Sequence, residues 1–271
     1  MTEKIWVSGH RGDRMHGDEN TMRAIRRAVC AGVDMVEIDV RMTKDGGLIL
    51  MHDATVDRTT NGHGRVQDLT VAEVRALDAA VHRTDLEAGS ESPALLTEVL
   101  EYLKSSPDVH LILEYKDHRR EGDPAFVEEA ADRITDLVLS SGLEERIIVN
   151  SFDGRTLEKV YERAGDCLAY HGFYPWYFMG PMDLDPERFL DMACILHWAL
   201  EDDGTIVRLP DPLSPEEWYD YVTAVGIAPL AAPSLRTLEN YEEAIRRGTR
   251  IVNADDPYEL LEYLKKTGRH H

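Results

Sequence analysis

The sequence predicts an α/β fold, a (β/α)8 TIM barrel with a small insertion after the second strand. Short apolar segments alternate with segments of helical spacing, and eight such strand–helix units fit within the 271 residues. An open doubly wound sheet is the alternative, but no glycine-rich nucleotide-binding fingerprint follows the first apolar segment. We therefore expect a closed barrel whose functional groups follow the carboxyl ends of its strands.

The first four units can be followed from their start and stop signals. The first helix begins near Thr21 and ends at Gly32, because glycine readily adopts the left-handed conformation that ends a helix. Apolar residues from Val127 to Val138 recur at helical spacing until Gly142. The expected strands are residues 4–9, 33–40, 109–115 and 146–150, and the helices after them are residues 20–31, 95–104, 126–139 and 154–164.

The last four units are shorter, and an aromatic loop at residues 173–178 lies among them. This loop either packs against a neighbouring helix or another copy of the chain, or acts as a lid that selects the substrate's alcohol group or rests on lipid. A Ser-Pro-Glu-Glu sequence from Ser214 is typical of a helix start. The expected strands are residues 167–171, 194–198, 227–231 and 250–253, and the helices are residues 186–192, 215–223, 235–247 and 257–266.

Residues 53–92 interrupt this alternation. They contain turn residues, a hairpin-like Asn-Gly-His-Gly sequence and one short helical piece around residues 70–79. Arg58 and Asn61 are expected to hold the turn of this segment. We interpret residues 1–271 as a single barrel domain and residues 53–92 as a small insertion within it.

Composition narrows the classes of partner. Thirty basic and 51 acidic residues leave a net charge of −21, which suits neither nucleic acid nor an anionic membrane surface. We expect no transmembrane segment, because no apolar run approaches the roughly 18–20 residues that cross a bilayer. The start of the chain lacks the apolar core of a signal peptide, which favours a cytoplasmic protein. Cys30, Cys167 and Cys194 are expected to be buried free thiols.

The stretch from residue 33 to residue 53 places acidic side chains in an apolar strand. Glu37 and Asp39 lie two residues apart and therefore share one face. Two buried carboxylates side by side are costly unless a cation lies between them. Glu114, near the end of the third strand, would add a third oxygen ligand, and an oxygen-rich site suits Mg²⁺ or Ca²⁺. The same stretch ends with His52, an acid/base candidate.

Other polar residues also follow strand ends, where a barrel places its catalytic groups. Lys116 shares a face with Glu114. Isolated histidines elsewhere are expected to be structural or exposed, namely His63, His82, His110, His118, His171 and His197. The residues expected at strand ends are His10, Arg11, Glu37, Asp39, Glu114, Lys116, Asn150, Ser151, His171, Trp198, Asp255 and Asp256.

A series of motifs in the first 116 residues occurs in a characteristic order. The motifs are His10-Arg11-Gly12, Glu19-Asn20-Thr21, Glu37-Ile38-Asp39-Val40, Thr43-Lys44-Asp45-Gly46, His52-Asp53, Arg58-Thr59-Thr60-Asn61-Gly62 and Glu114-Tyr115-Lys116. Together they resemble the glycerophosphodiester phosphodiesterase family, whose fold is a TIM barrel with a small insertion after the second strand. The sequence departs from the family pattern at Asp18, where proline is usual. It also lacks the tryptophan motif of the seventh strand, and residues 253–257 only approximate the usual ending.

The resemblance implies roles for the matching residues. Glu37, Asp39 and Glu114 would bind a divalent metal, Mg²⁺ or Ca²⁺. His10 and His52 would act as general acid and base, and Arg11 and Lys116 would contact the phosphate. Glu19, Asn20 and Asp53 would support these groups, although Glu19 could instead be an acid at a helix N-terminus and Asn20 a helix cap.

The function expected from these residues is metal-dependent hydrolysis of a small-molecule glycerophosphodiester to sn-glycerol 3-phosphate and an alcohol. The nucleophile is water or the glycerol 2-hydroxyl, the latter through a cyclic phosphate. One alternative is a phospholipase-type relative that acts on lysophospholipids or other lipid phosphodiesters. Others are a non-catalytic barrel that binds phosphorylated ligands, and enolase or aldolase chemistry. Self-association into a homo-oligomer is compatible with the sequence.

Overall fold

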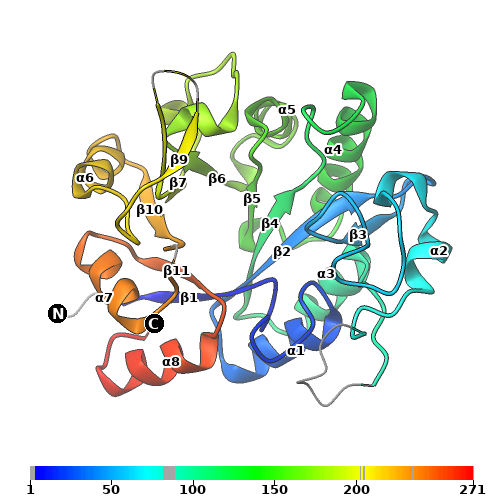
Figure 1. Cartoon of the computed structure of the whole chain (residues 1–271), viewed down its shortest axis with the longest axis horizontal. Coiled ribbons are helices and arrows are strands. Elements are labelled where there is room, and N and C mark those ends of the chain that lie inside the picture. The colour runs from blue at the N-terminus through cyan, green and yellow to red at the C-terminus, as the bar shows by residue number, and fades with distance from the viewer. Residues whose placement is uncertain (1–3, 82–88, 202, 204, 234, 271) are drawn as a thin grey trace.

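Eight parallel strands close into a barrel in the computed structural model, which describes residues 4–81, 89–201, 203, 205–233 and 235–270 (Figure 1). The first strand pairs with both the second and the last, and these two pairings close the barrel. The predicted (β/α)8 barrel is thus confirmed. Its strands are β1 (Trp6–His10), β2 (Met35–Met42), β4 (His110–Tyr115), β5 (Ile147–Asn150), β6 (Ala169–Tyr174), β7 (Met192–Ile195), β10 (Ala228–Ala231) and β11 (Ile251–Ala254).

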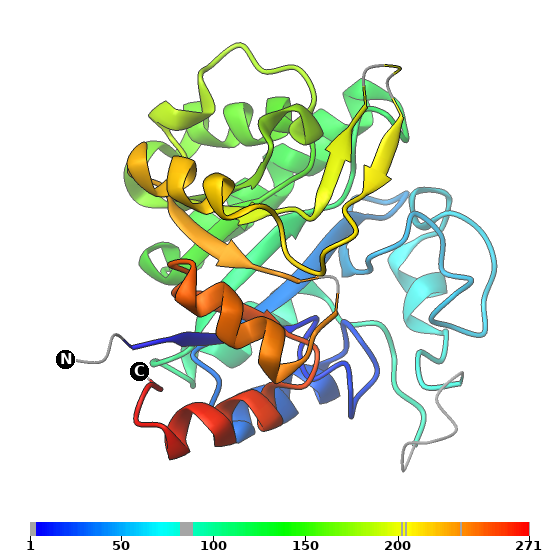
Figure 2. The same cartoon turned by 60° about the vertical axis from the view of Figure 1, so that its left-hand side comes forward.

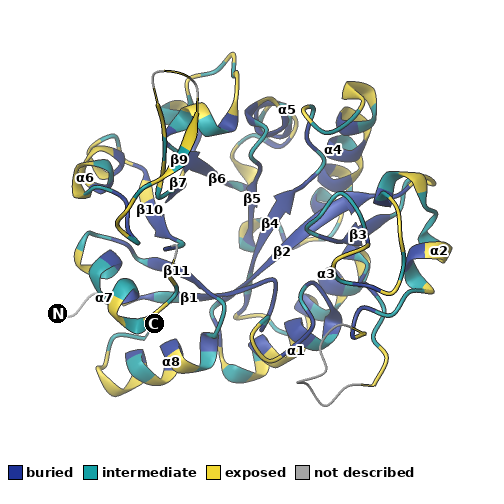
Figure 3. Ribbon diagram, in the orientation of Figure 1, coloured by how far each residue is buried: buried dark blue, intermediate teal, exposed yellow. Residues whose placement is uncertain are grey.

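The strands are buried because helices cover the outside of the barrel (Figure 3). All eight residues of β2 are buried, which is typical of a parallel strand covered on both faces. The helices turn a buried face to the strands and an exposed face to solvent. They are α1 (Met22–Ala31), α3 (Leu96–Lys104), α4 (Pro124–Leu139), α5 (Gly154–Ala164), α6 (Glu216–Ala224), α7 (Leu238–Arg246) and α8 (Pro257–Lys266).

The first helix illustrates how local signals set these boundaries. Thr21 caps α1 by accepting a hydrogen bond from the backbone N–H of Ala24, and Gly32 ends it in the left-handed conformation with φ of 92°. Asn20, one residue earlier, is therefore not the cap. The cysteine prediction is wrong in part, because Cys30 and Cys167 are exposed, although Cys194 is buried. Cys30 lies on the solvent side of α1, about 200° around the helix from buried Ala28.

Two predictions for residues 186–198 are wrong. A 3-10 turn, η5 (Pro186–Arg188), replaces the helix expected at residues 186–192, and the chain enters β7 at Met192. Phe189 and Leu190, between these elements, are both buried in the core, and β7 begins two residues after Leu190. Trp198 does not extend β7 but begins a separate hairpin of β8 (Trp198–Leu200) and β9 (Ile206–Arg208).

The segment after β2 departs from the strand–helix alternation, as expected of an insertion there, although it begins with a strand before residue 53 and residues 82–88 lie outside the described residues. Strand β3 (Leu48–Leu50) runs antiparallel to β2, and the turn η1 (Val66–Asp68) and helix α2 (Val71–Arg75) follow it. Apolar residues of this segment, including Ile49, Val56 and Val74, form a small core of their own. The insertion and the β8–β9 hairpin both lie on the right-hand side of Figure 2, where the barrel strands end. Within the described residues, no helix is long and apolar enough to cross a membrane.

Candidate active site

Three carboxylates meet at the carboxyl ends of neighbouring strands. Glu37 and Asp39 project from β2, and the register between β2 and β4 sets Asp39 opposite Glu114. One carboxylate oxygen from each of the three residues lies within 4.8 Å of the others, and all three side chains are buried. This convergence follows from the two-residue spacing on one strand and the parallel pairing with the next. The donor set is three hard oxygens, which fits Mg²⁺ or Ca²⁺.

Two basic side chains share this cluster. Lys116 Nζ lies 2.6 Å from Glu114 Oε1 and 3.2 Å from Asp39 Oδ1, and Arg11 Nε lies 3.2 Å from Asp39 Oδ2. Burial would raise the pKa of Asp39, but the charges of Lys116 and Arg11 hold it well below its ordinary value. Burial and the neighbouring carboxylates raise the pKa of Glu37 to about 8. A pKa of about 8 leaves Glu37 largely protonated at neutral pH, because Arg11 and Lys116 do not fully offset its burial and its acidic neighbours.

Unusual backbone conformations hold these groups in place. Arg11 and Asn20 both have positive φ, 56° and 58°, in a region that residues other than glycine seldom occupy. Asn20 donates from Nδ2 to Asp39 Oδ2 at 2.7 Å, and its Oδ1 accepts from the Asp39 backbone N–H. The Arg11 backbone N–H donates to Glu37 Oε2 at 2.8 Å. The strain is therefore located where the backbone orients two of the three carboxylates.

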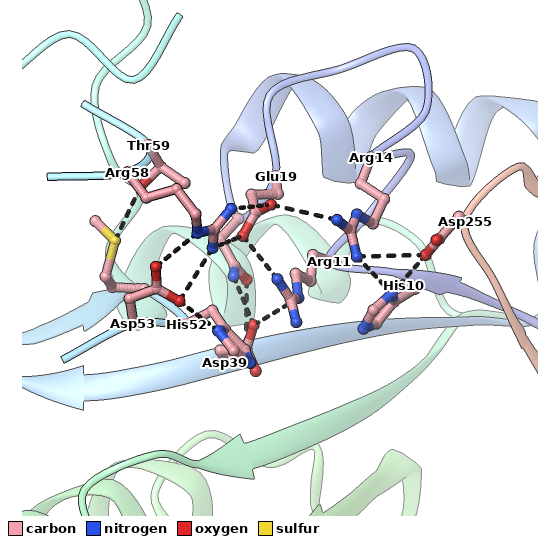
Figure 4. Close-up of polar contacts among 12 residues, drawn as sticks. His10, Arg11, Arg14, Glu19, Asp39, His52, Asp53, Arg58, Thr59 and Asp255 are labelled. Atoms are coloured by element: carbon pink, nitrogen blue, oxygen red, sulfur yellow. Dashed lines mark hydrogen bonds and ion pairs between the residues drawn. The ribbon is translucent and has the colours of Figure 1, made fainter. Parts of the chain in front are cut away.

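Each of the two predicted histidines is set against an aspartate (Figure 4). His10 Nδ1 lies 2.6 Å from Asp255 Oδ1, and His52 Nδ1 lies 2.6 Å from Asp53 Oδ1. At His52 this carboxylate favours the tautomer with the proton on Nδ1, which leaves Nε2 as a proton acceptor. At His10 the Arg236 guanidinium, which can only donate, also lies 2.9 Å from Nδ1. Burial, followed by the charge of Arg236, lowers the pKa of His10 to about 3. Burial and then Lys116 also lower the pKa of His52.

Glu19 and Arg58 link the loop after β1 to the insertion (Figure 4). Glu19 Oε1 lies 2.8 Å from both Arg11 Nη1 and Arg58 Nη2, and Arg58 Nε donates to Asp53 Oδ2 at 2.6 Å. Glu19 therefore lies outside α1 and contacts two arginines rather than the helix N-terminus. Arg58 reaches beyond its own turn, whereas Asn61 stays within the insertion and accepts from the Asp78 backbone N–H.

Several groups around the site were not identified from the sequence. Arg236, after β10, lies 2.9 Å from His10 Nδ1 and 2.8 Å from Asp255 Oδ1. Arg41 donates from Nε and Nη2 to the His52 carbonyl, at 3.1 and 3.0 Å. The contact between His10 and Asp255 could have been predicted from the sequence, because closing a barrel brings the last strand beside the first. Arg41 also had a signal, because it lies two residues after Asp39 on β2 and shares its face, whereas Arg236, in the loop after β10, had none. Of the histidines expected to be structural or exposed, His82 lies outside the described residues.

Comparison with known proteins identifies the family. The model of the glycerophosphoryl diester phosphodiesterase family matches residues 10–183, more than half of the chain. A glycerophosphodiester phosphodiesterase of Caldanaerobacter subterraneus is 37% identical over 161 residues, which are 59% of this chain and 63% of that protein. One from Bacillus altitudinis is 36% identical over 188 residues, 69% of each chain. The first match thus spans less than two thirds of its relative.

Solved structures share the fold at lower identity. A phosphodiesterase of Oleispira antarctica, solved in complex with the product sn-glycerol-3-phosphate, superimposes with a TM-score of 0.77 at 20% identity, covering 96% of each chain. A glycerophosphodiester phosphodiesterase of Agrobacterium tumefaciens gives a TM-score of 0.69 at 22% identity, covering 95% of this chain and 98% of that one. The match of the family model shows that the chain belongs to the glycerophosphoryl diester phosphodiesterase family.

Proposed function

We propose that this protein hydrolyses glycerophosphodiesters to sn-glycerol 3-phosphate and an alcohol in a metal-dependent reaction. The observation that carries the proposal is the convergence of Glu37, Asp39 and Glu114 at one end of the barrel. Two histidines with aspartate partners and two basic side chains lie around these carboxylates. The named relatives support the same reaction.

The three carboxylates would hold a divalent cation, either Mg²⁺ or Ca²⁺. When bound, such an ion acts as a Lewis acid that polarises a phosphoryl oxygen. The raised pKa of Glu37 supports this assignment, since a nearby cation would favour the charged form that the present surroundings disfavour. Enolase or aldolase chemistry would need no pair of histidines around these acids. It therefore accounts for fewer of the residues at this site than phosphodiester hydrolysis does.

The chain's own groups would bind and protonate the diester. Arg11 and Lys116 carry positive charge beside the carboxylates and would balance the phosphate and the charge that its oxygens gain in the transition state. His10 and His52, each with Nδ1 against an aspartate, would accept and donate protons through Nε2. Attack by water and attack by the glycerol 2-hydroxyl both fit this arrangement. Trapping a cyclic phosphate during turnover distinguishes the two routes.

Turnover of phosphodiesters with several head groups tests the proposal. Glycerophosphocholine and glycerophosphoethanolamine are incubated with the protein after EDTA treatment, and again after addition of Mg²⁺ or Ca²⁺. We expect activity to vanish with EDTA and to return with one of the two ions. Calorimetric titration of Glu37→Gln with that ion should show weakened binding, whereas the surface variant Glu262→Gln should bind it normally. Turnover that survives EDTA would refute the metal-dependent mechanism.

The alternative functions are separated by the same assay. Ligand binding without turnover of any phosphodiester would favour a non-catalytic barrel. Turnover only of lipid diesters would favour a phospholipase-type relative. A cytoplasmic location, a homo-oligomeric state and the domain boundaries remain predictions from the sequence.

A further inference from the structure

Two adjoining pockets extend from the candidate active site toward the β8–β9 hairpin. The inner pocket, of about 290 Å³, is lined by His52 and Lys116 of the site. The outer pocket, of about 340 Å³, shares Phe152, Phe178 and Arg120 with the inner one. Pockets of roughly 300 Å³ or more hold drug-sized molecules, so the two together have room for a leaving group much larger than choline.

The two pockets are basic, although the whole chain has a net charge of −21. Five lysine and arginine side chains line them, against two acids among the described lining residues, Glu121 and Asp153. Glu121 is already bonded to Arg41 at 3.2 Å, and Asp153 to Arg119 at 3.0 Å. An ammonium head group would therefore meet positive charge and acids that already have cationic partners, which opposes its binding.

Two arginines of the outer pocket are only weakly paired. Arg120 Nε lies 3.9 Å from Glu121 Oε1, and Arg155 Nη2 lies 3.9 Å from Asp183 Oδ1. Both distances exceed the length of a hydrogen bond. Guanidinium groups bind phosphate oxygens through paired N–H donors. Because Arg120 lines the inner pocket together with Lys116, it is in position to bind a second phosphate beside the reacting one.

Flat aromatic side chains line the same pockets. Phe152 and Phe178 belong to both pockets, Trp198 to the inner one and Tyr177 to the outer one. Phe152 is held in place by stacking on Phe173, with ring centroids 3.6 Å apart and an interplanar angle of 13°. Nucleobases stack on aromatic side chains, and phosphates bind arginine. A nucleotide uses both kinds of lining side chain, whereas a hydrocarbon chain or a simple polyol phosphate uses only one.

The aromatic wall begins at the cations of the active site. Lys116 Nζ lies 5.9 Å from the centre of the Phe152 ring. A group attached to a phosphate at Lys116 therefore enters the two pockets directly. For a glycerophosphodiester whose glycerol side faces the carboxylates, this group is the one that leaves in the reaction.

We infer that the two pockets bind a nucleoside 5′-monophosphate, as the leaving group of a nucleoside diphosphate glycerol. The inference rests on the proposed function and extends it from alcohols to a nucleotide leaving group, with sn-glycerol 3-phosphate still the product. The glycerol-bearing phosphate would lie beside Lys116, the second phosphate at Arg120, and the base against Phe178 or Trp198.

The reaction is the hydrolysis of a phosphoanhydride. The oxygen of water bonds to the glycerol-bearing phosphorus, and the bond from this phosphorus to the bridging oxygen breaks. The electron pair of the broken bond stays on the bridging oxygen, which leaves as part of the nucleotide's phosphate, and the proton of the water passes to a histidine and then to solvent. A phosphate monoester has a second pKa of about 6, so the nucleotide can leave without being protonated.

Release of sn-glycerol 3-phosphate from matched substrates tests this inference. The substrates are glycerophosphocholine, nucleoside diphosphate glycerols with cytosine, uracil or adenine, and the diphosphate in which a methyl group replaces the nucleoside, all with the activating metal in excess. The methyl diphosphate contains the same anhydride, so comparison with it isolates the contribution of the nucleoside. We expect kcat/KM to be about 5- to 100-fold higher for all three nucleoside substrates than for the methyl diphosphate, because stacking tolerates any base.

Substitutions in the pockets separate the two kinds of contact. Phe178→Leu should reduce the advantage of the nucleoside substrates over the methyl diphosphate. Arg120→Gln should lower kcat/KM for both diphosphates about two- to fivefold relative to glycerophosphocholine, because it removes an exposed charge. Arg133→Gln is the matched control for charge, since Arg133 is 50% exposed on α4, outside both pockets, and this variant should keep all the ratios. Thermal unfolding verifies that the variants fold.

Inhibition of the unchanged protein gives a test that needs no variant. A nucleoside 5′-monophosphate should inhibit glycerophosphocholine hydrolysis competitively, and more strongly than ribose 5-phosphate does. Equal kcat/KM values for the nucleoside and methyl diphosphates, or equal inhibition by the two monophosphates, would overturn the inference and leave turnover of glycerophosphocholine, and with it the proposed function, standing. No release of sn-glycerol 3-phosphate from any substrate would instead overturn the proposed function.

Discussion

The two sides of the barrel mouth differ in whether their buried polar groups have ionic partners. On the polar side, formed by β1, β2, β4 and the insertion, buried groups such as Asp39 and His10 each face an ionic partner. On the other side, formed by β6 and the hairpin, exposed apolar side chains such as Trp198 and Ile206 line the pockets together with basic ones, and neither ring nitrogen of buried His171 has a hydrogen-bond partner among the described residues. The family model ends at residue 183, before the hairpin. The comparison teaches that the carboxylate cluster belongs to the part of the chain that the family model matches, whereas the hairpin lies outside it.

Removing a histidine from the polar side should have the largest effect on turnover, and it tests whether that side carries the proton-transfer groups. His10→Ala or His52→Ala should lower kcat by about 10²–10⁴-fold, because each variant lacks one proton-transfer group. Steady-state kinetics with glycerophosphocholine measures the effect, and circular dichroism checks the fold. His63→Ala is the matched control, since the His63 side chain is 88% exposed in the insertion. Unimpaired turnover in His10→Ala or His52→Ala would contradict the acid/base assignment of that residue.

His171 offers a test of the other side. Burial lowers the pKa of His171 to about 3, below the value of about 6.5 expected in the unfolded chain. Between about pH 6.5 and pH 3, His171 is protonated in the unfolded chain but not in the native protein. The free energy of unfolding therefore falls as the pH drops through this range. At pH 4.5 the loss should be about 2–3 kcal/mol.

Urea unfolding of the natural protein and of His171→Leu, at pH 7 and pH 4.5, measures this loss. The difference between the two proteins cancels the contributions of the carboxylates. His171→Leu should lose less stability on acidification. An equal loss in both proteins would mean that His171 does not titrate as its unpaired, buried position requires.

A smaller effect is expected from the aspartate behind His10. Asp255→Asn leaves the shape of the side chain but removes the charge that faces His10 Nδ1 at 2.6 Å. Loss of one charge-assisted hydrogen bond should lower kcat/KM by about 10- to 100-fold. Asp256→Asn is a suitable control, because Asp256 caps α8 and asparagine caps helices equally well. Similar kinetics for the two variants would argue against a positioning role for Asp255.

The smallest effect concerns the bridge between the loop after β1 and the insertion. The Arg58 side chain is 46% exposed, so its ion pair with Glu19 should contribute only about 0.2–1 kcal/mol to stability. A double-mutant cycle with Arg58→Ala and Glu19→Gln, read by urea unfolding, isolates this coupling. A coupling several times larger would show that the bridge is shielded from solvent more than its exposure indicates.

Prediction from sequence succeeded where neighbouring residues carry the information. The spacing of Glu37 and Asp39 on an apolar strand was sufficient to place both on one face, and Thr21 with Gly32 marked the first helix. It failed where the outcome depended on packing between distant segments. Strands β8 and β9 have only three residues each, too few for a periodic pattern, and a short turn followed by β7 stands where a helix was expected at residues 186–192.

The sequence by itself determined the barrel, the acidic strand and the ordered motifs, because the side-chain period of a strand and the caps of a helix act within a few residues. The tertiary structure alone decided which groups face one another across the mouth. Barrel closure brings Asp255 and Arg236 to His10, and the packing of the hairpin beside the aromatic loop places Trp198 and Ile206 in one pocket with His52 and Lys116. These contacts join segments far apart in the chain, and their geometry depends on how the whole barrel closes rather than on any local preference.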